Sequence, residues 1–190
     1  MMVFGIQSNW KHHAYGMVFL LLALIRPVPG LAEDINVLMS TEDFLAHAFD
    51  GQYQSDIVWI TPSFRRQLEQ AMNSSFRGAR VRYWRNGNRS AWVLERIGKE
   101  RPITAGFVVQ NNQILLSRVL TYRESRGGEI QYPGFIAQFK GASLDKANRL
   151  NRHIDGITGA TLSVDAMKRM ATASLLMAKE SATPQQVSTQ

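Results

Sequence analysis

Apolar and polar residues alternate along the middle of the chain, as they do in β-strands with one buried face. Asn86-Gly87 separates the first two alternating segments and Asn111-Asn112 the last two, and both pairs favour tight hairpin turns. Antiparallel strands joined by short turns commonly have one covered face and one solvated face. The pattern therefore predicts an antiparallel meander over four segments: residues 80–85, 90–97, 103–110 and 113–122.

Apolar residues spaced three or four positions apart predict helices on both sides of these strands. Residues 63–72 show this spacing through Phe64 and Leu68. The clearest helix is expected to begin at Ser163, because a serine hydroxyl is a good N-cap. One apolar stripe runs along it, formed by Val164, Met167, Ala171, Leu175 and Ala178.

The chain before residue 63 predicts one further strand and one further helix, and the helix is preceded by a strand-like start at Ile35. Residues 56–61 are strand-like, and a short helix is expected to start at Ser40 or Thr41 and to run to His47. The fold class that follows is α+β, with an antiparallel meander and flanking helices in a single domain.

Residues 1–32 are typical of a secretory signal peptide and not of the fold. Lys11 precedes an apolar run at residues 14–25, Pro27 and Pro29 follow it, and Gly30-Leu31-Ala32 resembles a cleavage site. The run is too short to span a bilayer comfortably. An uncleaved membrane anchor is the alternative interpretation.

Composition narrows the possible chemistry. The chain has no cysteine, which excludes disulfides, thiol catalysis, iron–sulfur clusters and cysteine-bound haem. The net charge of +7 falls to +5 when Lys11 and Arg26 leave with the signal peptide. This charge suggests anionic partners, but export makes nucleic acid a poor candidate. The arginines around residues 77–89 are interpreted as a solvated strand face.

Two segments rich in small and hydroxyl residues are candidates for a binding site. One runs from Asp155 to Thr161, directly before the predicted helix at Ser163, and the other includes Gly127 and Gly128 at the end of a strand. The free N–H groups of a helix N-terminus stabilise a phosphate, and glycines let the backbone approach a ligand closely. A simple turn followed by an N-cap, and a plain surface loop, are the alternatives.

These segments resemble those of FMN-binding domain proteins. The family comprises exported or membrane-linked flavoproteins, related to one subunit of Rnf complexes and to one of the sodium-translocating NADH:quinone reductase. The resemblance covers about Ala91 to Met177. The residues that carry it are 103–122, 122–130 (YRESRGGEI), 135–141 (FIAQFKG) and 155–163 (DGITGATLS). It implies four regions: a signal peptide (1–32), a helical and hairpin region (33–90), an FMN-binding domain (91–180) and a disordered tail (181–190).

The resemblance also implies roles for individual residues. In the family, the signature is an Asp, two variable residues, Ser or Thr, Gly, Ala, and a final Ser or Thr that is esterified by the phosphate of FMN. Here the matching residues are Asp155, Thr158, Gly159, Ala160 and Thr161, so Thr161 would be the attachment residue, with Leu162 and Ser163 beside it. Residues near the flavin would include Glu124, Ser125, Gly127 and Gly128.

The implied function is electron transfer by an exported, periplasmic flavoprotein. A flavin transferase that uses FAD and Mg²⁺ would attach the FMN, and redox partner proteins, which include membrane-bound ones, would exchange electrons with it. No spanning helix is evident after residue 32, which argues against a place inside an Rnf-type complex. Asp155 is assigned to capping or to recognition by the transferase.

Two other functions remain open from the residues. One is a flavin-free periplasmic module that binds an anionic partner through the basic strand face. The other is a flavin-dependent reductase of an external acceptor, for which His153 would be the sole acid–base candidate. A structural role for His153 is the simpler interpretation. No metal site and no catalytic residue outside the flavin loops is predicted.

Overall fold

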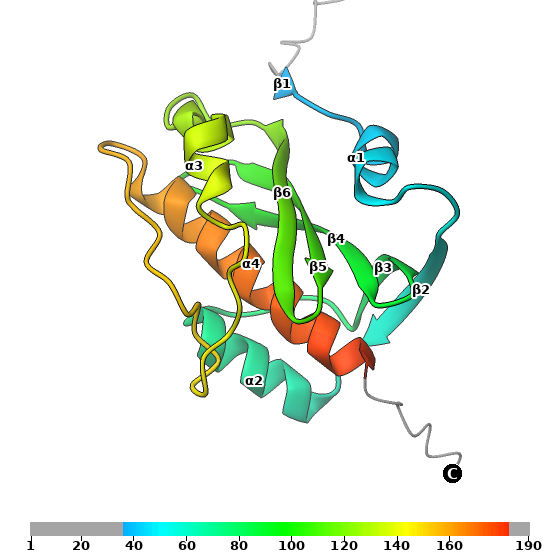
Figure 1. Cartoon of the computed structure of the whole chain (residues 1–190). Helices are drawn as coiled ribbons and strands as arrows, with labels where there is room; N and C mark the ends of the chain where they lie inside the picture. The colour runs from blue at the N-terminus through cyan, green and yellow to red at the C-terminus, as the bar shows by residue number, and fades with distance from the viewer. Residues whose placement is uncertain (1–35, 183–190) are drawn as a thin grey trace, which may run out of the picture. The chain divides into compact units, whose positions relative to one another are not determined.

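The four predicted strands lie in one antiparallel sheet of six strands. A computed structural model describes residues 36–182, and its elements are shown in Figure 1. The sheet order is β1-β6-β5-β4-β3-β2, with every neighbouring pair antiparallel. Its strands are β1 (Asn36–Val37), β2 (Gln54–Trp59), β3 (Arg80–Asn86), β4 (Arg89–Ile97), β5 (Pro102–Gln110) and β6 (Gln113–Tyr122). The predicted α+β class and antiparallel meander are confirmed.

Local turn chemistry sets the register at the centre of the sheet. Gln110 pairs with Gln113, and both residues between them have positive φ, 52° at Asn111 and 61° at Asn112. Positive φ at both central residues is the geometry of the type I′ turn, whose twist matches that of two antiparallel strands. Asparagine tolerates this backbone better than other non-glycine residues. Two adjacent asparagines therefore specify the turn of the β5–β6 hairpin.

Helices cover both faces of the sheet (Figure 1). Alternate residues of β4 and β5 show the two sides: Trp92 and Phe107 belong to one core cluster, and Ala91 and Val108 to another. The first cluster packs against α2 and α4, and the second against α1. The helical elements are α1 (Thr41–Ala48), α2 (Pro62–Met72), the 3₁₀ turn η1 (Gly128–Gln131), α3 (Pro133–Ala137) and α4 (Thr161–Ala182).

The caps of the first two helices follow from the sequence. The Ser40 hydroxyl accepts a hydrogen bond from the Asp43 N–H at 3.0 Å, so Ser40 is the N-cap of α1. Thr61 caps α2 in the same way, at 3.2 Å from the Phe64 N–H. Pro62 begins α2, where the missing N–H has no consequence.

The long helix α4 departs from the prediction at both its start and its surface. It begins at Thr161, two residues before the predicted Ser163, so Ser163 lies inside the helix and is not its N-cap. Its burial is also wider than one apolar stripe, because every residue from Met170 to Met177 is buried. The sheet covers one side of α4 and α2 packs against another, so even Thr172 and Ser174 are out of water.

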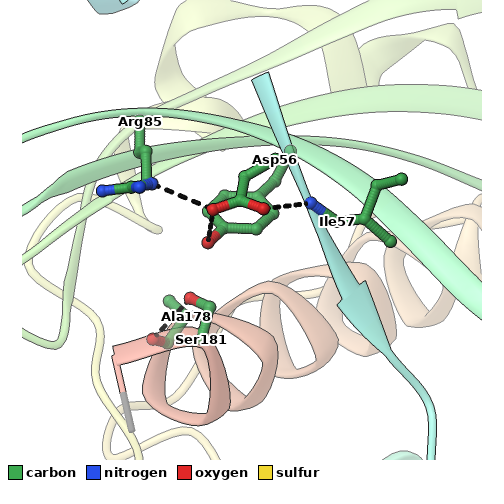
Figure 2. Close-up of polar contacts among 6 residues, drawn as sticks. Asp56, Ile57, Arg85, Ala178 and Ser181 are labelled. Carbon is green, nitrogen blue, oxygen red and sulfur yellow. Dashed lines mark hydrogen bonds and ion pairs between the residues drawn. The ribbon is translucent and has the colours of Figure 1, made fainter. Parts of the chain in front are cut away.

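A polar contact ties strands β2 and β3 together near the end of α4 (Figure 2). The Asp56 carboxylate accepts three hydrogen bonds: from the backbone N–H of Ile57 (2.8 Å), from Arg85 Nε (3.1 Å) and from the Tyr83 hydroxyl (3.3 Å). The Ile57 N–H is the largest cause holding the pKa of Asp56 below its usual value, and the bonds from Arg85 and Tyr83 add to it against the opposing effect of burial. Edge strand β2 is thus tied to its neighbour by side chains as well as by its backbone ladder.

The described residues, 36–182, belong to one compact unit. The boundary predicted between residues 90 and 91 falls inside β4, so the two predicted regions share a strand. The predicted signal peptide lies outside the described residues, and of the predicted tail only Ser181 and Ala182 are described, as the end of α4. Within residues 36–182, none of the helices combines the length and apolar character that crossing a membrane requires.

Candidate functional site

The loop before α4 ends in a tight turn that requires a glycine. The Ala160 N–H donates to the Ile157 carbonyl at 2.9 Å, and Gly159, the third residue of this turn, has a φ of 83°. A type II turn needs positive φ at that position, which glycine adopts without strain. No atom lies within 4 Å of where a Gly159 side chain would be, so backbone conformation rather than crowding favours glycine.

The turn delivers Thr161 to the first position of a 22-residue helix. The first intrahelical bond runs from the Val164 N–H to the Ala160 carbonyl, at 3.0 Å. The N–H groups of Thr161, Leu162 and Ser163 precede it, and such groups have no acceptor within their own helix. Thr161 is exposed, whereas Ser163 is only 4% exposed. The solvent-exposed Thr161 hydroxyl therefore lies beside N–H groups that favour an anion.

Glu124 is held by the turn between β4 and β5. One oxygen of its carboxylate accepts the backbone N–H groups of Lys99, Glu100 (2.9 Å) and Arg101 (3.0 Å). Burial raises the pKa of Glu124, but these three donors outweigh it and hold the pKa below its ordinary value. The carboxylate is therefore ionised and its charge is directed at the turn, which reduces its repulsion of an anion in the neighbouring pocket.

A second set of contacts fixes the start of α4 against the end of β6. The Tyr122 hydroxyl donates to the Arg126 carbonyl and lies 3.4 Å from the Ser163 hydroxyl. Gly127 has a φ of 83°, and a side chain there would lie 2.9 Å from the Ala160 Cβ. Gly127 thus allows the 124–127 segment to pack tightly against the first turn of α4.

These contacts surround a pocket of about 470 Å³ at the N-terminus of α4. It joins two segments more than thirty residues apart that the sequence had indicated separately. We call it the Thr161 pocket, and its lining residues are Lys99, Glu100, Glu124, Ser125, Arg126, Gly159, Ala160, Thr161, Leu162 and Ser163.

Four of the predicted site residues do not line this pocket. Gly127 packs against Ala160, which lines the pocket. Gly128 is the first residue of η1 and lies next to the Gln131 side chain. Thr158 is exposed within the turn. Asp155 lies six residues before α4, where its N–H donates to Gln138 Oε1 at 2.6 Å and its carboxylate faces His153 at 3.6 Å.

His153 also lies outside the Thr161 pocket. Its side chain is 85% exposed, and it lines a separate hollow beside α2 and α4. His153 and Thr161 line different pockets, so the structure gives no support for His153 as an acid–base residue at the Thr161 pocket.

Three lining residues were missed from the sequence: Lys99, Glu100 and Arg126. The available signal was Gly98, followed by three charged residues between two strands. A side chain at Gly98 would lie 2.8 Å from Glu124 Oε1 and 3.4 Å from the Ser163 hydroxyl. This glycine lets the β4–β5 turn close against the pocket, and its partners lie far away in the sequence.

The arrangement suits a phosphate monoester carrying a larger apolar group. Arg126 brings positive charge to the pocket, Lys99 pairs with Glu100 at 3.5 Å, and α4 presents its N-terminus. Leu162, next to Thr161, is 51% exposed and offers apolar contact at the pocket.

Comparison with known proteins agrees with this geometry. Residues 98–175 match the family model of the FMN-binding domain. The match begins at the turn that binds Glu124 and ends within α4, so it contains every residue that lines the Thr161 pocket. No curated protein matches the chain significantly.

Proposed function

This protein is an FMN-binding domain protein, with the domain at residues 98–175, and we propose that it carries FMN covalently on Thr161 and transfers electrons outside the cytoplasm. The observation that carries the proposal is the exposed Thr161 hydroxyl at the N-terminus of α4, inside a pocket shared with Glu124, Ser125 and Arg126.

The residues present fit the phosphate end of FMN. The N–H groups that open α4 would donate to phosphate oxygens, and the helix dipole would add about 0.3–1 kcal/mol at an exposed site. Arg126 would offset part of the remaining negative charge, since Lys99 is paired with Glu100. Ala160 is buried, which fixes the backbone directly before Thr161, and Gly159 leaves open space on the solvent side.

A hydroxyl at this position suits attachment by a transferase. In the reaction we propose, the Thr161 oxygen forms a new bond to the flavin-side phosphorus of FAD, the pyrophosphate bond breaks, AMP leaves, and the hydroxyl proton is released. Mg²⁺ in the transferase would stabilise the leaving phosphate. The transferase must reach Thr161, and its exposure at the end of a helix permits this approach. The exposed Asp155–His153 pair is the feature upstream that a transferase could recognise.

Once attached, the flavin supplies one- and two-electron chemistry. The chain's contribution is to hold the group: Leu162 offers apolar contact, and three backbone N–H donors bind one oxygen of Glu124, which offsets part of its negative charge. Exchange of electrons with partner proteins suits the exposed pocket better than turnover of a small substrate, because its carboxylates are already engaged: Glu100 pairs with Lys99 at 3.5 Å, and Glu124 accepts three backbone N–H groups.

Export and covalent attachment support each other. The predicted signal peptide would deliver the chain to the periplasm, where a cofactor held only by contacts would be diluted away. A phosphoester prevents that loss. A free periplasmic carrier is the form we propose, with redox partners that include membrane-bound proteins.

The attachment site is tested by Thr161→Ala. When the protein is produced with a flavin transferase and separated on a denaturing gel, the wild type should fluoresce under ultraviolet light and its mass should rise by one FMN unit. Thr161→Ala should lose both signals completely, because no hydroxyl remains at the helix start.

The matched control is Ser55→Ala, which removes an exposed hydroxyl from β2, outside the 155–161 signature. This variant should keep the fluorescence and the added mass. Fluorescence that persists in Thr161→Ala would assign the bond to another residue and overturn the proposal.

A further inference from the structure

The sheet is split between β3 and β4. Their pairing ends at Trp84 and Ala91, although β3 continues back to Arg80 and β4 continues to Ile97. Tyr83 and Trp92, the next residues after the last paired ones, stack with their ring centroids 4.5 Å apart. Beyond them lies a cavity of about 730 Å³, which we call the β3–β4 slot.

The slot is strongly positive. Its lining includes Arg77, Arg80, Arg82, Arg96 and Arg169, against one acid, Glu95. Glu95 interacts with residues that do not line the slot: its carboxylate accepts a hydrogen bond from the Thr104 hydroxyl at 3.1 Å and forms an ion pair with Arg123 at 3.5 Å. Arg80 lies over the Trp59 ring at 5.9 Å. The other arginines have no carboxylate within ion-pair distance among residues 36–182.

Arg96 and Arg169 form the inner part of this charge. Arg96 donates to the Ser74 hydroxyl and to the Ser75 carbonyl (3.2 Å), both of which are neutral. Burial and then the nearby charge of Arg169 lower the pKa of Arg96. Two guanidinium groups that repel one another in a partly buried place are stabilised when an anion lies between them.

Apolar groups line the same side of the slot. Val81 and Leu94 are partly buried against the main core, and Met170 comes up from α4. A bare inorganic anion would leave these groups in contact with water, whereas an organic anion would cover them.

We propose that the β3–β4 slot binds a small organic anion, with its carboxylate or phosphate between Arg96 and Arg169 and its apolar body against Val81, Leu94 and Met170. Guanidinium groups recognise both kinds of head group through paired hydrogen bonds. Arg77 and Arg82, which are exposed, attract the anion to the mouth of the slot.

The slot is separate from the Thr161 pocket. The two share no lining residue, and Arg169 lies eight residues after Thr161 on α4, which is about 12 Å along a helix. Ile97 ends the slot, and Lys99 begins the pocket two residues later. Binding in the slot therefore needs no flavin, and the two proposals can fail independently.

Calorimetric titration of the protein with three probes tests the site. Phenyl phosphate carries both an anion and an apolar ring, inorganic phosphate carries the anion alone, and benzyl alcohol carries the ring alone. Phenyl phosphate should bind most tightly of the three. Absence of saturable binding by phenyl phosphate, or equal binding by benzyl alcohol, would overturn the proposal.

Variants then locate the binding. Arg169→Gln should weaken phenyl phosphate binding about tenfold or more, the loss of one charge-assisted bond. Arg169→Lys keeps the charge but not the paired donors and should give a smaller loss. Arg66→Gln, an exposed arginine on α2 outside the slot, changes the net charge equally and should have no effect.

Two outcomes decide the matter. Equal losses in Arg169→Gln and Arg66→Gln would show that only net charge is sensed, and the slot would not be the site. Repeating the titration with Thr161→Ala separates the slot from the flavin pocket: unchanged affinity supports the slot, and lost affinity overturns it.

Discussion

Glu124 illustrates how one carboxylate can shape a site meant for an anion. Its charge is taken up by the backbone N–H groups of residues 99–101, which joins the β4–β5 turn to the end of β6. The same contacts close one wall of the Thr161 pocket. The structural role of Glu124 is therefore to position the β4–β5 turn at this wall.

Glu124→Gln should make the protein less stable by about 1 kcal/mol near neutral pH, because charge-assisted bonds become neutral ones at a partly exposed site. The folded-state pKa of Glu124 is depressed below 4.5, so its contribution is present above that value and is lost as the pH falls through the folded-state pKa. Urea unfolding across the acid range should therefore show a shallower loss of stability in the variant. Glu129→Gln, an exposed acid in the same segment, should follow the wild type; a wild-type slope in Glu124→Gln would contradict this assignment.

At the scale of elements, α4 connects the Thr161 pocket to the core. Its N-terminus carries Thr161, and its middle is buried against the sheet and α2. Small residues make this close approach possible, since Ala171 and Ser174 are both 0% exposed. The helix is therefore a rigid base for a cofactor at its end, which is what precise placement of a redox group requires.

Ala171→Leu should destabilise the protein by about 1–3 kcal/mol, because the added methylenes have no room between α4 and the sheet. Chemical denaturation measures this loss. The same substitution at Ala182, the exposed last residue of α4, serves as the control and should change stability by less than about 0.5 kcal/mol. Full stability in Ala171→Leu would mean that the helix does not pack as closely as described.

At the scale of the molecule, the FMN-binding domain and the chain before it share one sheet and one core. Val58, Phe64 and Leu68, which lie before residue 91, belong to the same cluster as Phe107 and Met167. Strands β3 and β2 extend the sheet beyond β4, where the family match does not reach. The match marks the flavin-binding part, but it does not mark an independent folding unit.

The protein should therefore unfold in one cooperative transition. Trp59 and Trp84 lie before residue 91 and Trp92 directly after it, so tryptophan fluorescence reports on the strands around this boundary, and the proposed flavin on Thr161 would report on the pocket. Their thermal transitions, followed by tryptophan and flavin fluorescence, should coincide. A chain of residues 91–182 alone should fail to fold, because it exposes the core side of β4; two separate transitions, or a folded 91–182 fragment, would contradict a shared core.

The positions of several strands and helices could be predicted from the sequence, because they depend on residues close together in the chain. Alternation located β3 to β6, paired asparagines specified the β5–β6 turn, and the hydroxyl caps located α1, because each rests on neighbours within a few residues. The small residues before α4 and the segment at Glu124 were likewise recognisable as candidate site segments from their types and spacing.

The contacts between these elements could not be predicted from the sequence and are known from the three-dimensional fold. Sequence reasoning began α4 at Ser163, but packing of Ser163 against Tyr122 and Gly127 draws the helix start back to Thr161. The roles of Lys99 and Arg126, and the β3–β4 slot, depend on contacts between residues far apart in the chain. Local propensity carries no information about such contacts, since they are set by how the sheet, α4 and the connecting turns pack together.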